Sequence, residues 1–137
     1  VFTEGDKEYY ERLKPFAMKL GSTFQKVNFL RDVKADYMNL NRNYFPGVDL
    51  GNFSDLQKSQ IEIEIEEEFR QALIGIKLLP FSSRGGVYLS YIYYKELFNK
   101  IKSVSANQIM DKRIRISNSH KIGLMFDSMI RYKMNAL

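Results

Sequence analysis

The sequence predicts an all-α protein, a helical bundle within one domain. Two observations support this class. Every long segment repeats its apolar residues at spacings of three and four, and Pro, Gly and Asn gather between these segments. The chain has 137 residues, of which 45% are hydrophobic and 14% aromatic, which is enough for a modest core. It has no cysteine, so disulfides and thiolate metal sites are excluded.

A first helix is expected from about Lys7 to Met38, where apolar residues recur at helical spacing from Leu13 onward. Pro15 lies within this range and predicts either a kink or a second helix that starts after one short turn. Residues 39–52 carry Asn, Pro and Gly, and this composition predicts a loop.

A second helix is expected from Ser54, which forms a capping box with Gln57, to Leu79 before Pro80. Residues 61–66 alternate strictly between Ile and Glu, a pattern typical of a strand. We still predict a helix, because the apolar residues continue at spacings of four and three to the end of the segment. The run of glutamates up to position 68 is interpreted as a solvated face.

A third helix is expected after a cap at Ser82 or Ser83, with an apolar and aromatic stripe that favours a core position. The stripe consists of Val87, Tyr91, Tyr94, Phe98 and Ile101. Residues 103–115 are ambiguous and allow a short helix. A last helix is expected from Asn118 or Ser119 to about Met134, and the single histidine, His120, is interpreted as a surface residue at its start.

Four polar residues of the first helix form one stripe: Gln25, Asn28, Asp32 and Asp36. At about 100° per residue they fall within roughly 80° of arc. The residues between them are largely apolar, which predicts a buried helix with a polar seam that faces a wet or charged cavity. Two carboxylates on adjacent turns of this seam require a cation. Oxygen ligands of this kind fit Mg²⁺, which keeps several waters and takes substrate phosphate oxygens.

Charge is unevenly distributed along the chain, whose net charge is +5. Residues 95–137 hold nine Lys or Arg and three Asp or Glu, whereas residues 55–68 hold six acids and one Lys. The basic end could contact phosphates of any kind, although a solvated basic face is the simpler interpretation. No apolar run approaches the roughly 20 residues of a membrane span. No signal-peptide pattern precedes the first helix, and a cytoplasmic location is expected.

Several motifs together closely resemble the squalene/phytoene synthase family. They are Glu4-Gly5-Asp6, Leu20-Gly21, Gln25-x-x-Asn28-x-x-Arg31-Asp32-x-x-x-Asp36 and Arg42-x-Tyr44-Phe45-Pro46. The third resembles the second aspartate-rich motif of the family, and the fourth its continuation. Tyr94 resembles an active-site tyrosine, and Arg113 resembles a phosphate-facing arginine, with a slightly longer gap between the two. The residues of these motifs are most similar to those of bacterial phytoene synthases.

The resemblance implies part of the all-α isoprenoid-synthase fold and the head-to-head condensation of two prenyl diphosphates. It implies Mg²⁺ as the cofactor, with Mn²⁺ as the alternative, bound by Asp32 and Asp36 with help from Asn28. Gln25 would face the cavity that binds substrate, and Tyr94 would line the path of the carbocation. Arg31, Tyr44 and Arg113 would contact diphosphate. Arg31, Tyr44 and Tyr94 are the residues expected to act in catalysis.

The sequence departs from the family pattern in two places. Position 35, where many members carry a third acid, is Ala35. Only one DxxxD motif is present, whereas the family has two on facing helices. We therefore expect residues 1–137 to be the C-terminal part of a single domain, inactive without an N-terminal part that carries the first motif. Geranylgeranyl diphosphate is the preferred substrate and phytoene the product, with squalene and dehydrosqualene as alternatives.

Two other function classes stay open. A non-catalytic helical interaction module would tolerate Asp32→Ala and Asp36→Ala without losing its partner, whereas a synthase would lose activity. A basic nucleic-acid-binding domain would show a steep salt dependence. It has no use for the polar stripe, because carboxylates repel phosphate without a metal, so no nucleic acid is expected as a partner. Peripheral membrane contact is compatible with lipid products.

Overall fold

The computed structural model describes residues 2–40, 53–111 and 114–135, and it describes the side chains of these ranges except those of 34–40. Five helices follow one another: α1 (Lys7–Leu40), α2 (Asp55–Leu78), α3 (Phe81–Lys102), α4 (Ala106–Asp111) and α5 (Asn118–Lys133). The described ranges contain no strand. The all-α prediction is therefore confirmed, and the alternating residues 61–66 lie within α2.

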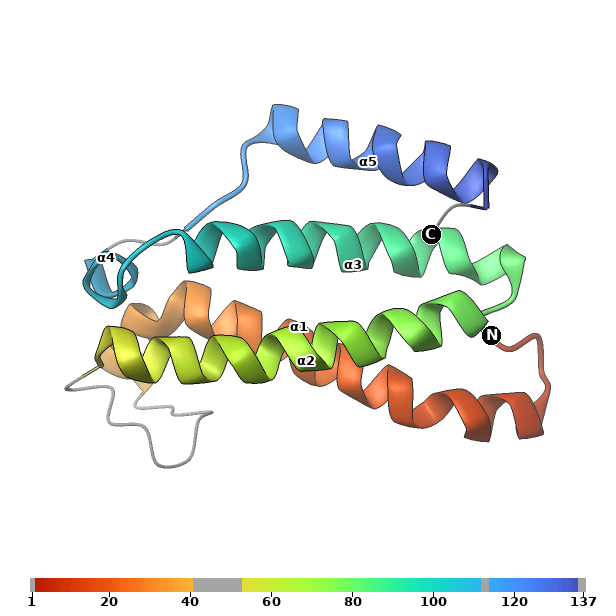
Figure 1. The fold of residues 1–137 in the computed structure, drawn as a ribbon, viewed down its shortest axis with the longest axis horizontal. Helices are drawn as coiled ribbons and strands as arrows, with labels where there is room; N and C mark the ends of the chain where they lie inside the picture. The colour runs from red at the N-terminus through yellow and green to blue at the C-terminus, as the bar shows by residue number, and fades with distance from the viewer. Residues whose placement is uncertain (1, 41–52, 112–113, 136–137) are drawn as a thin grey trace.

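The four long helices run side by side, and the chain reverses direction from each to the next (Figure 1). α1 packs against α2, α3 and the short α4, and α2 also packs against α3. α5 lies on the outer side of α3, away from α1 and α2 (Figure 1). No described helix combines the length and the apolar composition that a membrane crossing needs.

The core lies where α1, α2, α3 and α4 meet, and the predicted helical stripes supply it. Removing each large apolar side chain from water contributes about 1.5–3 kcal/mol, so these stripes hold the helices together. The most completely buried large side chains of the core are Phe29, Leu30, Ile65, Phe69, Leu97, Phe98, Ile101 and Ile109. In α2, Ile61 and Ile65 are buried whereas Ile63 is 70% exposed, as a helical period requires.

α1 is one continuous helix that includes Pro15, so the alternative of a second helix starting at this residue is wrong. Asp6 caps its start, because its Oδ1 accepts a hydrogen bond of 2.9 Å from the backbone N–H of Tyr9. The predicted burial of this helix holds for only part of it. The buried part begins near Val27 and reaches Val33, both of which are buried. Most residues of the first four turns are exposed.

The capping predictions have different outcomes. Ser54 forms the expected capping box with Gln57 at the start of α2. The prediction of a cap at Ser82 or Ser83 is wrong: Pro80 is the N-cap of α3, without a side-chain cap. The two serine hydroxyls instead donate to the N-terminal segment, Ser82 to Glu4 Oε1 (2.6 Å) and Ser83 to the carbonyl of residue 2 (2.9 Å).

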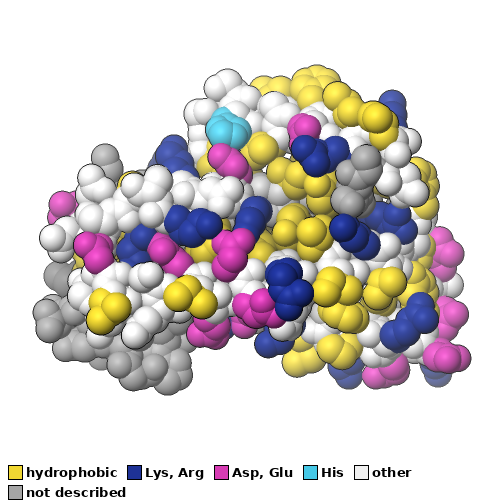
Figure 2. Space-filling model, viewed as in Figure 1, with side chains coloured by type: hydrophobic (Ala, Val, Ile, Leu, Met, Phe, Trp, Pro, Cys, Tyr) yellow, Lys and Arg dark blue, Asp and Glu magenta, His cyan; other side chains and the backbone are white. Residues whose placement is uncertain are grey.

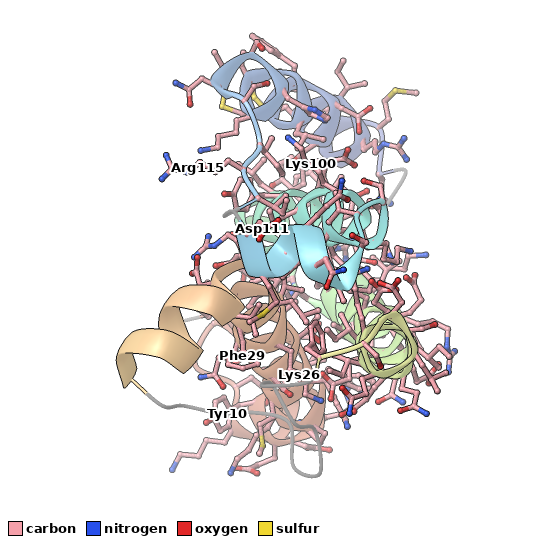
Figure 3. The ribbon with its side chains drawn as sticks, turned by 90° about the vertical axis from the view of Figure 1, so that its left-hand side faces the viewer. Tyr10, Lys26, Phe29, Lys100, Asp111 and Arg115 are labelled. Carbon is pink, nitrogen blue, oxygen red and sulfur yellow. The ribbon has the colours of Figure 1, made fainter. Side chains whose placement is uncertain are left out.

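The solvated-face interpretation of the glutamate run is wrong for Glu68, which is buried at the α1–α2 interface. Its Oε1 accepts a 2.8 Å hydrogen bond from Lys26 Nζ, and its Oε2 accepts one of 3.2 Å from Ser22 Oγ. Thr23 lies beside the same carboxylate, and Lys26 also pairs with Glu64. Figure 3 shows Lys26 on the side of α1 that faces α2. A buried charge needs such partners, and Glu68 has them.

The segment after α3 is held in place by hydrogen bonds to other elements. The Asp55 carboxylate at the start of α2 accepts a 2.7 Å hydrogen bond from the first N–H of α4. Lys100 donates to the carbonyl of Arg115, which precedes α5 (Figure 3). Ser117 caps α5, so the predicted start of the last helix at Asn118 is confirmed, and His120 is exposed near that start.

Candidate functional site

The candidate site begins with a contact between α1 and α3. Asn28 Nδ2 donates a 3.1 Å hydrogen bond to Tyr94 Oη. Phe24, one turn before Asn28, stacks on the Tyr94 ring with 4.0 Å between ring centroids. Tyr93 meets the same ring edge-on, at 5.4 Å. The Tyr94 side chain is therefore fixed from two sides, and it holds the Asn28 amide in one orientation.

Asn28 Oδ1 is buried and has no hydrogen-bond partner. It is the one buried side-chain nitrogen or oxygen with this property in the part of the chain that the structure describes. A buried polar atom left unpaired costs about 1–3 kcal/mol. Such an atom in a native fold requires an explanation, and a bound ligand or water is one. The oxygen is thus available to a ligand at the α1–α3 interface.

Asp32 follows Asn28 by one turn of α1 and forms an ion pair with its neighbour Arg31. Arg31 donates from Nε (3.1 Å) and Nη2 (2.7 Å) to Asp32 Oδ2. Both side chains are partly buried, with 19% and 22% exposed. The hydrogen bonds to Asp32 raise the pKa of Arg31 above its ordinary value, against the opposing effect of burial. Arg31 is therefore a permanent cation beside the Asp32 carboxylate, one helical turn after the unpaired amide oxygen of Asn28.

These residues fit a magnesium site of the open kind. The Asn28 amide oxygen and the Asp32 carboxylate are hard oxygen ligands one turn apart, and Mg²⁺ typically takes one or two carboxylates together with waters and phosphate oxygens. The described residues contain no cluster of three or more His, Cys, Asp or Glu side chains that could hold a metal alone. The side chain of Asp36, one turn further along α1, lies outside the described side chains.

The predicted site residues divide into three groups. Asn28, Arg31, Asp32 and Tyr94 lie together at the α1–α3 interface. Gln25 is exposed on α1, one turn before Asn28. Three residues fall outside the description: the side chain of Asp36, and all of Tyr44 and Arg113.

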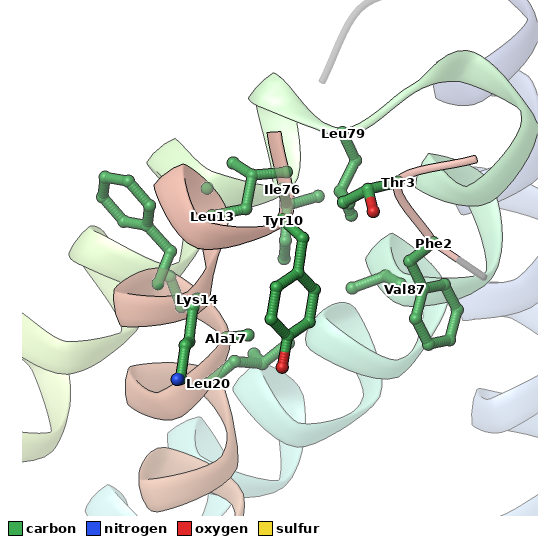
Figure 4. Close-up of a pocket in the computed structure, with 13 residues that line it drawn as sticks. Phe2, Thr3, Tyr10, Leu13, Lys14, Ala17, Leu20, Ile76, Leu79 and Val87 are labelled. Atoms are coloured by element: carbon green, nitrogen blue, oxygen red, sulfur yellow. The ribbon is translucent and has the colours of Figure 1, made fainter. Parts of the chain in front are cut away.

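An apolar pocket of about 250 Å³ lies further toward the start of α1 (Figure 4). Its walls come from α1, the end of α2, the start of α3 and the N-terminal segment. The lining includes Phe2, Tyr10, Leu13, Ala17, Leu20, Ala72, Gly75, Ile76 and Val87. Gly75 allows α1 to approach closely, because a Cβ there would lie 2.2 Å from the Cβ of Phe16.

The pocket and the polar residues share one face between α1 and α3. On α1, Leu20 lines the pocket, Phe24 follows four residues later and Asn28 four later still. On α3, Val87 of the pocket precedes Tyr94 by two turns. Sequence reasoning missed the pocket, because its helical stripe is indistinguishable from ordinary core. The available signal was the spacing of four residues that leads from Leu20 through Phe24 to the polar Asn28.

A second depression lies between α3 and α5, where Lys121 Nζ sits 5.6 Å from the ring centroid of Tyr93. Tyr93 in turn meets Tyr94. Lys121 thus places a cation two aromatic rings away from Asn28, an arrangement that the sequence did not indicate.

One comparison with known proteins identifies a relationship. The sequence model of the family described as squalene/phytoene synthase matches residues 1–120. No curated protein and no solved structure matches the chain significantly. The matched range includes α1 to α4 and all the candidate site residues, and it stops at the third residue of α5.

Proposed function

The chain belongs to the squalene/phytoene synthase family, and from this premise we propose that it supplies the second metal- and diphosphate-binding half of a head-to-head prenyltransferase. Members of this family are prenyltransferases with an all-α isoprenoid-synthase fold, and they use divalent metal ions and prenyl diphosphate substrates. The proposed substrate is geranylgeranyl diphosphate and the proposed product is phytoene. The proposed metal is Mg²⁺.

The unpaired Asn28 Oδ1, one helical turn before the Arg31–Asp32 ion pair, is the observation that carries the proposal. Asn28, Asp32 and Asp36 would hold Mg²⁺. When bound, Mg²⁺ neutralises charge on the departing diphosphate. Arg31 supports that role, because a permanent cation next to the metal ligands can bind diphosphate oxygens. Tyr44 and Arg113 are proposed to contact the same diphosphate, and Gln25 to contribute from the exposed rim of the site.

The apolar pocket supports a hydrocarbon substrate. Its lining is almost entirely apolar, and Leu20 and Val87 of that lining precede Asn28 and Tyr94 by about two turns on α1 and α3. A prenyl chain whose diphosphate lies at Asp32 would extend past Phe24 and Tyr94 toward Leu20 and Val87. Tyr94 would then line the passage between the two regions along the path of the carbocation, held there by the Phe24 ring that stacks on it.

The proposal includes an incomplete site. One aspartate-rich motif serves one diphosphate, and the condensation releases two, so an N-terminal part of the same enzyme would supply the first motif. We expect the 137 residues alone to show no synthase activity. Mg²⁺-dependent turnover of geranylgeranyl diphosphate by these residues alone would contradict this part of the proposal.

The decisive test is product analysis of the enzyme that contains this chain and its N-terminal part, supplied with C15 and C20 diphosphates. We expect a C40 hydrocarbon from the C20 substrate in the presence of Mg²⁺. A C30 product from the C15 substrate would retain the reaction and correct the substrate. If Asp32→Ala leaves every activity and every partner unchanged, the alternative of a non-catalytic interaction module is correct.

A further inference from the structure

The apolar pocket begins some distance along α1 from Asn28, the proposed diphosphate end of the site. Leu20 is the α1 residue of the lining nearest to Asn28, and Tyr10 is the one furthest from it. At about 1.5 Å per residue, these two residues lie about 12 Å and about 27 Å from Asn28 along the helix axis. The pocket therefore follows about 15 Å of α1, on the side of Leu20 away from the polar residues.

The N-terminal segment closes the far end of the pocket. Phe2 and Thr3 line it, and two hydrogen bonds hold this segment against the start of α3. Ser82 Oγ donates to Glu4 Oε1 (2.6 Å), and Ser83 Oγ donates to the carbonyl of Phe2 (2.9 Å). The pocket thus has an end of its own within the described residues, and its length can be compared with that of a ligand.

The end of the bundle that holds the pocket also has an apolar surface. Toward the right of Figure 2, where α2 ends, hydrophobic side chains gather on the surface, whereas acidic and basic side chains alternate further left over α2 and α3. The pocket itself lies between the start of α1 and the end of α2 (Figure 4). A hydrocarbon fits such surroundings, because apolar surface gains free energy when it leaves water.

A prenyl chain anchored at Asn28 can be measured against the pocket. Each isoprene unit adds four carbon–carbon bonds of about 1.5 Å, or about 5 Å in an extended zigzag, so a C15 chain reaches about 15 Å and a C20 chain about 20 Å. The C15 chain ends just past Leu20, near the beginning of the pocket. The fourth unit of a C20 chain lies fully within the pocket and ends before Tyr10. The pocket therefore has the length that a C20 chain uses and a C15 chain does not.

The smallest side chains of the pocket lie where the fourth unit begins. Ala17 is about 16 Å from Asn28 along α1. Gly75 of α2 lies at the same level, because a Cβ there would be 2.2 Å from the Cβ of Phe16. This contact forbids a larger residue at Gly75, whereas Ala17 is exposed and has room for one. Leu20 lies beside the third unit, which both chains possess.

We propose that Ala17 determines the length of the prenyl chain that the site accepts. Its methyl group leaves space for the fourth isoprene unit, so the C20 diphosphate is preferred to the C15 diphosphate. A larger side chain at position 17 would occupy this space, and only the shorter chain would fit. This role of Ala17 rests on the proposed function, because Asn28 is taken as the diphosphate end of the site.

Competition between C15 and C20 diphosphates tests the proposal in the enzyme that contains this chain and its N-terminal part. We expect the parent to prefer the C20 substrate. Ala17→Phe should lower the ratio of kcat/KM for C20 to that for C15 at least about tenfold, because even one misplaced methylene in an apolar pocket changes kcat/KM by about 10–200-fold. Ala17→Leu should lower the ratio less. The kcat/KM for the C15 substrate should stay near that of the parent in both variants.

Met18→Phe is the matched control. Met18 is the next residue of α1, is 67% exposed and does not line the pocket, so the same ring there should leave the ratio unchanged. Because Ala17 is exposed as well, thermal unfolding of Ala17→Phe should match that of the parent. Three results would overturn the proposal: a parent that prefers the C15 substrate, an equal loss for both substrates in Ala17→Phe, or the same shift in Met18→Phe.

Equilibrium binding separates the role of Ala17 from the proposed reaction. Farnesyl and geranylgeranyl thiolodiphosphates carry sulfur in place of the oxygen at the breaking bond, so they can be titrated without turnover. Ala17→Phe should weaken binding of the geranylgeranyl analogue at least about tenfold more than binding of the farnesyl analogue. If condensation occurs but Ala17→Phe changes neither preference, the role of Ala17 is wrong and the reaction stands. If binding shifts as expected but no condensation product forms, the role stands and the reaction is wrong. If neither analogue binds to the parent, both are wrong.

Discussion

The two sides of α1 differ in how completely their buried polar groups are paired. On the side that faces α2, the buried Glu68 carboxylate accepts hydrogen bonds from Lys26 and Ser22. Although burial acts to lower it, hydrogen bonds to Glu64 and Glu68 raise the pKa of Lys26 above its ordinary value. On the side that faces α3, the Asn28 amide donates to Tyr94 while its oxygen has no partner.

This difference separates structure from function within one helix. A fully paired buried network gains nothing from a ligand, so the α2 side serves to hold the two helices in register. An unpaired buried oxygen is a stability cost that a ligand can remove, so the α3 side is the side that we propose for binding. Substitutions on the α2 side should therefore change stability, and substitutions on the α3 side should change binding and turnover.

The largest effect is expected for Asp32→Asn in the enzyme that contains this chain. The substitution removes the charge that we propose binds the metal, and it removes the carboxylate that pairs with Arg31. Turnover of prenyl diphosphate should fall by about 10²–10³-fold, the magnitude typical of losing one electrostatic contact in a transition state. The midpoint of thermal unfolding, followed by circular dichroism, should change little. Retained turnover would show that the α3 side is not the catalytic side.

The reverse outcome is expected for Glu68→Leu. The substitution leaves the Lys26 ammonium, only 17% exposed, with a single partner in Glu64. Breaking a buried ion pair in this way costs about 3–5 kcal/mol, and the partial exposure of Lys26 reduces this to about 2–3 kcal/mol. Urea unfolding should show the loss, whereas turnover per folded molecule should stay near that of the parent. Glu64→Leu, at a position exposed to solvent, is the matched control and should cost less than about 1 kcal/mol.

The sequence predicted the helices and the composition of the core well, because helical spacing over many turns is a strong signal. It also named Asn28, Arg31, Asp32 and Tyr94 through their resemblance to the family, and the structure places them together at the α1–α3 interface, where their role stays a prediction. It did not predict that Glu68 is buried, because a glutamate within an acidic run looks solvated until α1 packs against it. Nor did it predict the role of Ser82 and Ser83, whose partners lie near residue 1. Contacts between residues distant in the sequence leave no local pattern.

Asn28→Leu should separate the effect on stability from the effect on metal binding at one position. It removes the unpaired oxygen, which favours stability, and it removes the bond to Tyr94, worth about 1 kcal/mol, so the net change should lie within about 1 kcal/mol. The concentration of Mg²⁺ that gives half-maximal turnover should rise at least about tenfold if Asn28 is the metal ligand that we propose. Asn28→Asp should restore part of the affinity. If Asn28→Leu raises stability and leaves the Mg²⁺ dependence unchanged, the oxygen is not a ligand.

The smallest effect concerns two tyrosines of α3. Tyr91 packs edge-on against Phe69 of α2, at 5.5 Å, whereas Tyr94 faces α1. Burial raises the pKa of Tyr91 to about 12, with smaller contributions from Tyr88 and Glu66. Because the pKa in the unfolded chain is about 10, the stabilising effect of the bound proton is complete below pH 10 and is lost as the pH rises through 12.

The Tyr91→Phe variant has no phenol proton to lose at this position. Its free energy of unfolding, relative to that of the parent, should therefore rise by on the order of 1–2 kcal/mol between pH 9 and pH 12. Urea unfolding of both proteins across the range measures the difference and cancels the titration of lysines that they share. Tyr94→Phe is the control from the α3 side of α1. It deletes the acceptor of Asn28 Nδ2 and should raise the Mg²⁺ requirement at neutral pH. Tyr91→Phe should leave that requirement unchanged. A shift of equal size in both variants would mean that the two sides of α1 are coupled through α3 and do not act separately.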